Sequence, residues 1–473
     1  MTNMENSYLK NTLILSLGKF ATQFISIILL PLFTRYLLVD EYGYIDLIQT
    51  YINLFIPVFL FCIDTAIFRF LIDKRENKIY QNKIITNSFI FSAIQIVGIT
   101  FCFTLLNKFI NIKFYYFTLI NLLVLMISNV LFQTCRGIGK NKEYSIATII
   151  IALFNLFINI FSITILHIGA EAILISSIIG NTFAIIYMIF KIKFFKKFNF
   201  RYFDKLIIKE MLKYSIPMIP NTLSWWIINV SDRTILSIFL STAANGIYTI
   251  SCKFSNIINS IFSIFIMSWQ ETASLHIDDE NKNEFFSKNI NETLVFFCSL
   301  VIGCITCIPL IFNIIIGNEY FESYKYIPIL LISCVFSILT ALIGGIYVAK
   351  KDSKEIAKTS LLSAIINLII NLIFINYIGI YAACISTFIS YFLMMIYRIC
   401  DVKKYIKLTF DIKKIAIIFI LLLISTILYF IKNKYILMFL LVVEIPLLYI
   451  LNNSFIKDFK NIILIKFFGR KSI

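Results

Sequence analysis

Residues 327–348 read IPILLISCVFSILTALIGGIYV, a run of 22 residues without a charged side chain. A helix of this length covers about 33 Å, which is enough to cross the hydrocarbon core of a bilayer. Similar runs recur along the whole chain of 473 residues, which is 59% hydrophobic and 15% charged, with a mean hydropathy of +0.87. Soluble domains are about one quarter charged. The sequence therefore predicts an all-α integral membrane protein with little mass outside the bilayer.

The number of transmembrane helices follows from counting runs of about 20 mostly apolar residues. The first run is longer than the apolar region of a signal peptide and lacks a cleavage pattern, so we expect it to be a span. Fourteen spans are predicted, at residues 11–33, 45–68, 84–106, 114–134, 145–166, 170–190, 214–240, 247–269, 291–312, 327–348, 357–376, 381–398, 413–431 and 436–454.

The basic residues lie almost entirely on one side of these spans. Of the 43 Lys and Arg residues, 34 fall in loops on the side of the N-terminus, six fall on the other side, and three lie within spans. Cytoplasmic loops carry the excess of Lys and Arg in membrane proteins. Both termini are therefore predicted to be cytoplasmic. The net charge of +17 is thus a topology signal, and we expect no nucleic-acid partner.

Two halves of the chain resemble each other. An offset of 203 places Gly43 on Gly246 and Asn53 on Asn256, and later matches follow at offsets of 210 to 212. Coincidence in an apolar chain is the alternative, but ordered matches at a near-constant offset favour duplication. Six spans per half give two lobes of parallel topology, related by an axis along the membrane normal. The predicted parts are an N-terminal lobe (1–190), a basic cytoplasmic connector (191–213), a C-terminal lobe (214–400), and two further helices with a tail (401–473).

Polar residues form stripes at helical spacing in spans 1, 2, 7 and 8, which are equivalent pairs in the repeat. Charged residues inside a membrane usually face a cavity or a partner. These stripes predict one hydrophilic cavity, and the alternative is interhelical hydrogen bonding that only joins the helices. The candidate substrate-binding residues are Lys19, Arg69, Arg233, Lys253, Asn53, Asn256 and Trp225.

The charge of this predicted cavity leans cationic, which suits an anionic head group such as a phosphate or diphosphate. Asp64 and Asp232 are the carboxylates that could instead neutralise the cations, and they are the candidate coupling residues. The chain has no GxxxxGK[ST] phosphate loop and only two histidines, so we expect no ATPase activity of its own, no metal site, no cofactor and no catalytic residues.

Three stretches carry a family resemblance. They are Pro31-Leu-Phe-Thr-Arg35 running to Gly43, Pro217-Met-Ile-Pro220 running through Trp225-Trp226 and Asp232-Arg233 to Phe254, and Ser268-Trp269-Gln270-Glu271. The chain resembles the polysaccharide transporters, or Wzx-like flippases, of the multidrug/oligosaccharidyl-lipid/polysaccharide exporter superfamily. The resemblance covers nearly the whole chain, and its middle stretch is the most specific.

The resemblance implies a flippase that exports polyprenyl-diphosphate-linked oligosaccharide repeat units across the cytoplasmic membrane of a bacterium. Such export by alternating access would serve the biosynthesis of a surface polysaccharide such as O-antigen or capsule. The implied partners are the lipid-linked oligosaccharide, membrane lipids and other polysaccharide assembly proteins. The cavity cations of the family correspond to Lys19, Arg69, Arg233 and Lys253. Three alternatives stay open: a peptidoglycan-precursor flippase, a cation-coupled drug exporter of the same superfamily, and a membrane glycosyltransferase or polymerase.

Overall fold

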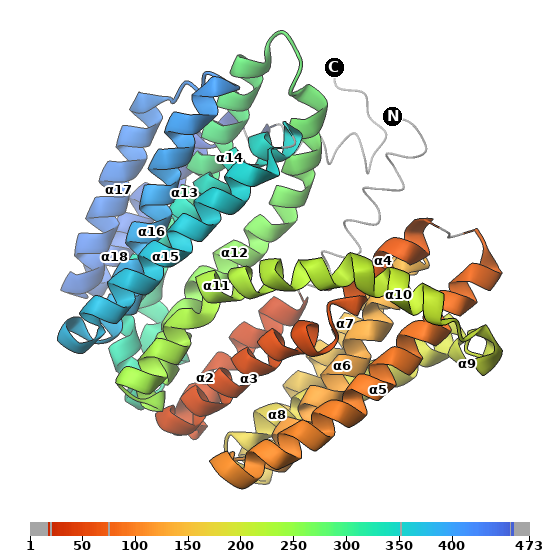
Figure 1. Cartoon of the computed structure of the whole chain (residues 1–473). Coiled ribbons are helices and arrows are strands. Elements are labelled where there is room, and N and C mark those ends of the chain that lie inside the picture. Colours follow the sequence, from red (N-terminus) through yellow and green to blue (C-terminus); the bar gives the residue numbers. More distant parts are fainter. Residues whose placement is uncertain (1–17, 19–20, 74–75, 351, 455, 458–473) are drawn as a thin grey trace. The chain divides into compact units, whose positions relative to one another are not determined.

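The fold consists of long helices joined by short turns. A computed structural model describes residues 18, 21–73, 76–350, 352–454 and 456–457, and in this part of the chain all regular secondary structure is helical (Figure 1). Among these residues, eleven helices are long and apolar enough to cross a membrane, or twelve when the bent pair of α3 (Val39–Phe59) and α4 (Ile63–Asp73) counts as one span. The predicted all-α membrane fold is therefore confirmed.

The predicted spans correspond to the observed helices in chain order. Twelve of the fourteen spans fall on the eleven helices and the bent pair. The first span falls partly on residues outside the described part, and its remainder is the shorter apolar helix Ala21–Tyr36. The seventh falls on α11 (Ile219–Phe239). Helices α5, α12 and α13 have 33, 35 and 34 residues, so each continues past its apolar run into the region predicted as a loop.

The chain forms two compact units. Of the described residues, the first unit contains those up to Ser237 together with Ser241–Gly246, and the second contains Ile238–Leu240 and those from Ile247 onward. Most of α11 thus belongs to the first unit, where its polar side chains contact α3 and Cys62. The lobes predicted from the repeat, which are separated by the connector at 191–213, are a different division of the chain from these compact units. They stay a prediction. The elements before α11 are α2 (Leu30–Tyr36), α3, α4, α5 (Lys78–Ile110), α6 (Tyr115–Gly137), α7 (Asn141–Ile160), η1 (Phe161–Ile165), α8 (Glu171–Ile192), α9 (Phe194–Lys197), η2 (Phe200–Tyr202), α10 (Lys205–Ser215) and η3 (Ile216–Met218).

The second unit repeats the helix order of the first and adds two helices at its end. Its helices α13 to α16 correspond to α5 to α8, and α17 and α18 pack on α13. The elements are α12 (Thr242–His276), α13 (Lys282–Ile315), η4 (Asn318–Lys325), α14 (Ile327–Ala349), α15 (Ser353–Ile378), α16 (Ile380–Asp401), η5 (Val402–Lys404), α17 (Ile412–Ile431) and α18 (Lys434–Leu451).

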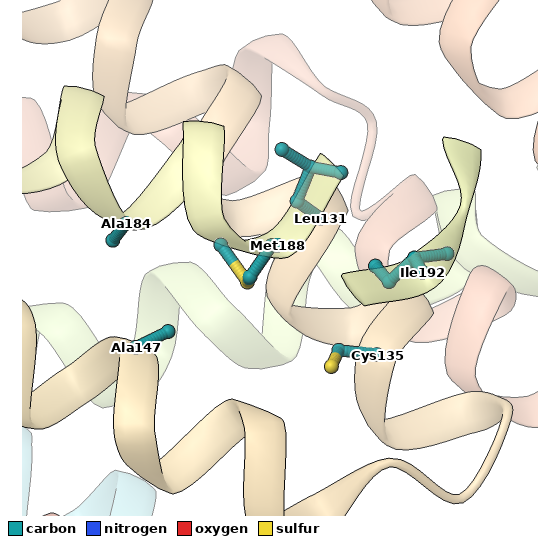
Figure 2. Close-up of a cluster of buried hydrophobic side chains, with 6 residues drawn as sticks. All are labelled: Leu131, Cys135, Ala147, Ala184, Met188 and Ile192. Atoms are coloured by element: carbon teal, nitrogen blue, oxygen red, sulfur yellow. The ribbon is translucent and has the colours of Figure 1, made fainter. Parts of the chain in front are cut away.

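An apolar cluster joins α6, α7 and α8 in the first unit. Figure 2 shows the side chains of this cluster, which come from all three helices. Small residues on α7 and α8 allow the helices to approach closely, as is common in membrane bundles. The cluster consists of Leu131, Cys135, Ala147, Ala184, Met188 and Ile192, all fully buried or nearly so.

The linker after each set of six spans is held in the same way. In the first unit, the Asn87 amide donates to the Tyr202 carbonyl at 2.9 Å and its oxygen accepts from the Asp204 amide at 2.8 Å. In the second unit, the Asn291 amide donates to the Thr409 carbonyl at 2.8 Å and accepts from the Asp411 amide at 3.1 Å. Each aspartate then caps the next helix, α10 or α17. These matched contacts support the duplication.

Candidate functional site

The polar faces of α3 and α11 meet at an ion pair. The Arg233 guanidinium lies 3.0 Å from one oxygen of Asp46 and donates to the other at 3.2 Å. The same Nη1 donates to the Thr50 hydroxyl at 3.0 Å, one turn further along α3. The side chains of Arg233 and Asp46 are 22% and 14% exposed, so the pair is largely shielded. Shielding strengthens the attraction, because the local dielectric is lower than in water.

This geometry changes the interpretation of Arg233. The sequence suggested adjacent Asp232 as its neutralising partner, whereas the structure shows an ion pair with Asp46 on another helix. Asp232 is itself 4% exposed. A second polar contact joins the same two helices, because the Tyr51 hydroxyl donates to Thr234 at 3.2 Å. Side-chain contacts of Arg233 and Thr234 therefore join α11 to α3 in the first unit, and the cavity predicted from the polar stripes stays a prediction.

The second feature is a break in the predicted second span. Helix α3 ends at Phe59 and α4 begins at Ile63, with a bend of 57° between them. Phe61 and Cys62 between them have left-handed φ values of 51° and 52°, which α-helices do not accommodate. Pro57 lies one turn before the break and lacks an amide hydrogen, which favours a kink at this place.

Asp64 lies at this break, in the first turn of α4, where helix amides favour a negative charge. Its side chain is only 8% exposed, and within the described residues its Oδ1 atom has no hydrogen-bond partner. The Thr65 hydroxyl donates to the Cys62 carbonyl at 2.7 Å, and the Cys62 thiol lies 3.7 Å from the Thr222 hydroxyl of α11. A buried carboxylate at a helix break is a suitable place for a proton or cation.

For each of the other candidate residues, the structure gives the exposure of the side chain, or the residue lies outside the described part of the chain. Lys19 lies outside the described residues, and so does the side chain of Trp225. Asn53 on α3 and Asn256 on α12 are both exposed, as expected for residues at equivalent positions in the repeat. Arg69 is exposed on α4, and Lys253 is half-buried on α12, one turn before Asn256. The common binding role of these residues stays a prediction.

The beginnings of α3 and α12 cross at two glycines, each the fifth residue of its helix. A Cβ atom built on Gly43 would overlap the Thr242 carbonyl and lie 2.7 Å from the Gly246 amide nitrogen. A Cβ on Gly246 would lie 2.5 Å from the Val39 carbonyl. The Asn245 amide donates to the Gly43 carbonyl at 2.8 Å, which ties the crossing together.

Two buried ionisable residues were not among the predicted site residues. Glu444 on α18 is 1% exposed, and its two carboxyl oxygens lie within hydrogen-bond distance of the Thr306 and Ser425 hydroxyl groups. Arg398 on α16 is 3% exposed, although the sequence placed it at the cytoplasmic end of its span. It donates to the Thr340 carbonyl at 2.8 Å and to the Thr359 hydroxyl at 2.7 Å. A single charged residue within an apolar run was the available signal for Glu444.

In the described part of the chain, no three His, Cys, Asp or Glu side chains lie close enough together to hold a metal ion. The features that remain are an ion pair between helices, a carboxylate at a helix break, and cations on α4 and α12. These groups can bind anions or protons and can hold or release helices.

Comparison with known proteins identifies the family. A family model described as polysaccharide biosynthesis protein matches residues 8–269, more than half of the chain. The chain belongs to this family. Among its relatives is the uncharacterized membrane protein MJ1375 of Methanocaldococcus jannaschii, which is 25% identical over 371 residues, covering 73% of this chain and 86% of the relative. The family resemblance seen in the sequence is thereby confirmed.

Solved structures show which fold this family member adopts. A structure of lipid II flippase MurJ in an inward closed conformation is 18% identical, covers 94% of this chain and 99% of that chain, and has a TM-score of 0.66. An inward-facing multidrug resistance MATE transporter is 12% identical, covers 81% and 98%, and has a TM-score of 0.61. The polysaccharide family member therefore has the fold of the multidrug/oligosaccharidyl-lipid/polysaccharide exporter superfamily.

Proposed function

We propose that this protein is a flippase that exports polyprenyl-diphosphate-linked oligosaccharide repeat units across the cytoplasmic membrane by alternating access. The exported units would serve the assembly of a surface polysaccharide such as O-antigen or capsule. The observation that carries the proposal is membership of the polysaccharide biosynthesis protein family over residues 8–269. The transporter fold supports movement of a substrate rather than its chemical conversion.

The cations of the polar stripes support an anionic head group as the recognised part of the substrate. In this proposal Lys19, Arg69, Arg233 and Lys253 bind the diphosphate, while Asn53, Asn256 and Trp225 contact the sugars. A guanidinium forms strong charge-assisted hydrogen bonds with carboxylate and phosphate oxygens alike. In this proposal Asp46 pairs with Arg233 in the absence of substrate, and the bound diphosphate takes the place of Asp46 beside Arg233.

Coupling to an ion gradient is assigned to Asp64 and Asp232. Both carboxylates are more than nine-tenths buried, and burial makes the charged form costly unless a proton or cation neutralises it. Asp64 also lies where α3 and α4 bend, so neutralising it would change the electrostatics of the bend itself. The ion is then bound where the second span can respond to it.

A peptidoglycan-precursor flippase is the second candidate, because the MurJ structure covers 94% of this chain. Both substrates pair a polyprenyl diphosphate with sugars, so the cations suit either. Deleting the gene distinguishes them. We expect loss of a surface glycan and accumulation of its lipid-linked repeat unit with normal growth of the cell wall. Accumulation of the lipid-linked peptidoglycan precursor with an unchanged surface glycan would contradict the proposal.

Substitution of Lys253 tests the binding role at one residue. Lys253→Ala should abolish the surface glycan at an unchanged protein level, and Lys253→Arg should retain part of it, because charge is the main requirement. Lys403→Ala is the matched control, since this lysine is exposed in η5 after the last repeat helix. A normal glycan in the Lys19→Ala, Lys253→Ala double variant would remove both residues from the site.

The proposed orientation places both termini and residues 191–213 in the cytoplasm, as the distribution of Lys and Arg predicts. Reporter fusions after Lys213 and after Gly246 should report opposite sides of the membrane. Two fusions on the same side would contradict this topology.

A further inference from the structure

Glu444 is a carboxyl group inside an otherwise apolar helix. It lies in the middle of α18, whose other charged residue is Lys434 at the first position, and its side chain is 1% exposed. Each carboxyl oxygen lies against one hydroxyl group of a neighbouring helix. Oε2 is 2.8 Å from the Thr306 hydroxyl of α13, and Oε1 is 2.6 Å from the Ser425 hydroxyl of α17.

Both hydroxyl groups also contact carbonyl oxygens of their own helices. The Ser425 hydroxyl oxygen is 2.6 Å from the Leu421 carbonyl, and the Thr306 hydroxyl oxygen is 3.1 Å from the Ile302 carbonyl. A hydroxyl group has one hydrogen and cannot donate fully in two directions. Around Ser425, two oxygen–oxygen contacts of 2.6 Å therefore need two hydrogens, and serine supplies only one.

A proton on Glu444 completes this network. The acid then donates from Oε1 to the Ser425 oxygen, Ser425 donates to the Leu421 carbonyl, and Thr306 donates to Oε2. Every short contact then contains one hydrogen. A carboxylate would instead be a buried charge held by two hydroxyls, which is costly in an apolar interior.

The groups around Glu444 supply no counter-charge among the described residues. On α13 the titratable neighbour is the Cys307 thiol, which is neutral in its ordinary form. On α17, Tyr429 follows Ser425 by one turn and donates its hydroxyl hydrogen to the Tyr324 carbonyl at 2.8 Å. The nearest lysines along the helices are Lys432, about 10 Å from Ser425, and Lys434, about 15 Å from Glu444. Lys414, at the start of α17, pairs with Asp411, and no ion pair among the described residues includes Glu444.

We propose that Glu444 is a proton-binding site, and that its proton joins α18 to α13 and α17. When the proton leaves to water, Ser425 must turn its hydrogen from the Leu421 carbonyl to Oε1, and a charge remains in the apolar interior. The joint between the three helices weakens. The last two helices, which lie outside the repeat, thus respond to protons. This inference rests on the packing of the second unit and does not depend on which substrate the protein carries.

Infrared spectroscopy of the full-length protein in proteoliposomes tests the protonation directly. A protonated carboxylic acid has its own carbonyl stretching band. We expect the difference between wild type and Glu444→Gln at neutral pH to contain this band, and the difference between wild type and Glu319→Gln to lack it, because Glu319 is exposed in η4. A carboxylate band in the Glu444→Gln difference would overturn the proposal, whatever the outcome of transport assays.

Thermal unfolding against pH tests the role of the proton. The amide of Glu444→Gln can donate to Ser425 and accept from Thr306, so it imitates the protonated acid without titrating. The group binds its proton in the folded state, so wild-type stability should fall as the pH rises. We expect the melting temperature of wild type to fall more between neutral and alkaline pH than that of Glu444→Gln. Equal falls in the two proteins would overturn the proposal.

Discussion

Gly43 and Gly246 pack against each other with reciprocal geometry. A Cβ on Gly43 would overlap the carbonyl of Thr242, and a Cβ on Gly246 would lie 2.5 Å from the carbonyl of Val39. Each carbonyl belongs to the residue four positions before the other glycine. The offset of 203 that maps Gly43 onto Gly246 also maps Val39 onto Thr242, so the two halves of the contact are equivalent.

The first prediction concerns the glycine crossing. Gly43→Ala should separate the starts of α3 and α12, because the new methyl group meets a backbone carbonyl that cannot rotate away. Overpacking of this kind costs about 1–3 kcal/mol. The measurement is disulfide formation between cysteines introduced at positions 40 and 242, whose native side chains are hydrogen-bonded to each other. A protease site inserted in residues 191–213 separates the two halves of the chain, so that only a disulfide holds them together on a denaturing gel. Cross-linked halves should stay together in the parent and fall apart in Gly43→Ala.

Two glycines provide matched controls for this substitution. Gly98 on α5 and Gly303 on α13 have open space where a Cβ would stand. Alanine should be tolerated at both and should favour the helix by about 0.5–1 kcal/mol. Equal cross-linking in Gly43→Ala, Gly98→Ala and Gly303→Ala would show that the close crossing does not hold α3 and α12 together.

The second prediction concerns the ion pair of Arg233 and Asp46. A double-mutant cycle with Arg233→Met and Asp46→Leu should give a coupling energy of about 1–3 kcal/mol, since the pair is largely shielded from water. Tyr51→Phe with Thr234→Val provides a neutral comparison between the same helices. Hydrogen bonds inside membrane proteins average about 0.6 kcal/mol. Thermal unfolding in detergent measures both cycles, and a coupling no larger than that of Tyr51 and Thr234 would contradict the prediction.

The third prediction concerns the linker before α17. The amides of Lys407, Thr409 and Asp411 donate at 3.0 to 3.1 Å to Asn283, Ser287 and Asn291, which share one face of α13. Asn291→Ala should therefore speed hydrogen exchange of the Asp411 amide and its neighbours. Loss of one such bond corresponds to about 1 kcal/mol, or roughly fivefold in local opening.

Asn289 is the matched control for Asn291. It lies two residues earlier on α13, and its side-chain amide donates to the Phe285 carbonyl of its own helix at 2.8 Å. Asn289→Ala should leave exchange in 405–411 unchanged. Asn87→Ala should repeat the effect of Asn291→Ala at Asp204, because its two contacts are equivalent. An effect at one linker but not at the other would show that Asn87 and Asn291 do not play equivalent roles, despite their matched contacts.

The fourth prediction concerns pH. The Tyr405 hydroxyl donates to Asp352 at 2.7 Å, and this bond, with Lys404 nearby, lowers the pKa of the Asp352 carboxyl below its ordinary value. A lowered folded-state pKa means that the contact stabilises the fold above the ordinary aspartate range, near pH 3.9, and is lost as the pH falls through the lowered value. Tyr405→Phe should move this loss to higher pH. Cleavage of residues 401–411 by an acid protease across about pH 2–5 measures it, and Asp352→Asn should remove the dependence.

The helical spans and the repeat were predictable because they depend on patterns within the sequence. Apolar runs of about 20 residues fix the spans, and the offset of 203 already paired Gly43 with Gly246. The break at Phe61 and Cys62 was not predictable, since neither residue is a typical choice for left-handed backbone. The pairing of Arg233 with Asp46 was also missed. Adjacent residues point to different faces of a helix, so Asp232 was the nearer residue in sequence but Asp46 was the partner in space.

The last prediction concerns Arg398, whose contacts with Thr340 and Thr359 on two other helices were likewise missed. The repeat maps Ile186-Tyr187 onto Ile396-Tyr397, so Arg398 corresponds to Met188, the centre of the apolar cluster in Figure 2. The offset of 212 between 155 and 367 likewise maps Ala147 onto Thr359. Where the first unit has methionine against alanine, the second has a guanidinium that donates to a threonine. Gly344 leaves the space, since a Cβ there would lie 2.9 Å from the Arg398 Nη1 atom.

If the role of Arg398 is only to fill the space between α14, α15 and α16 and to hold these helices together, methionine should replace it with little loss of stability. Replacing buried charges with well-packed apolar side chains is often neutral or stabilising, because the cost of desolvation disappears. Thr359 can still donate to the Glu355 carbonyl at 2.7 Å. Arg398→Met should therefore melt close to wild type, while Arg398→Ala should lose about 2–5 kcal/mol through the cavity it leaves.

The reciprocal substitution makes the test decisive. Met188→Arg would bury a cation against Ala147, which offers no hydroxyl group, and should destabilise the first unit severely. Arg398→Lys keeps the charge but cannot make the two-directional contacts to Thr340 and Thr359, so we expect it to melt below Arg398→Met. The opposite order, with lysine close to wild type and methionine lowest, would show that the charge itself is required at this position. In that case Arg398 would have to be considered with Lys253 as a cation that acts in transport.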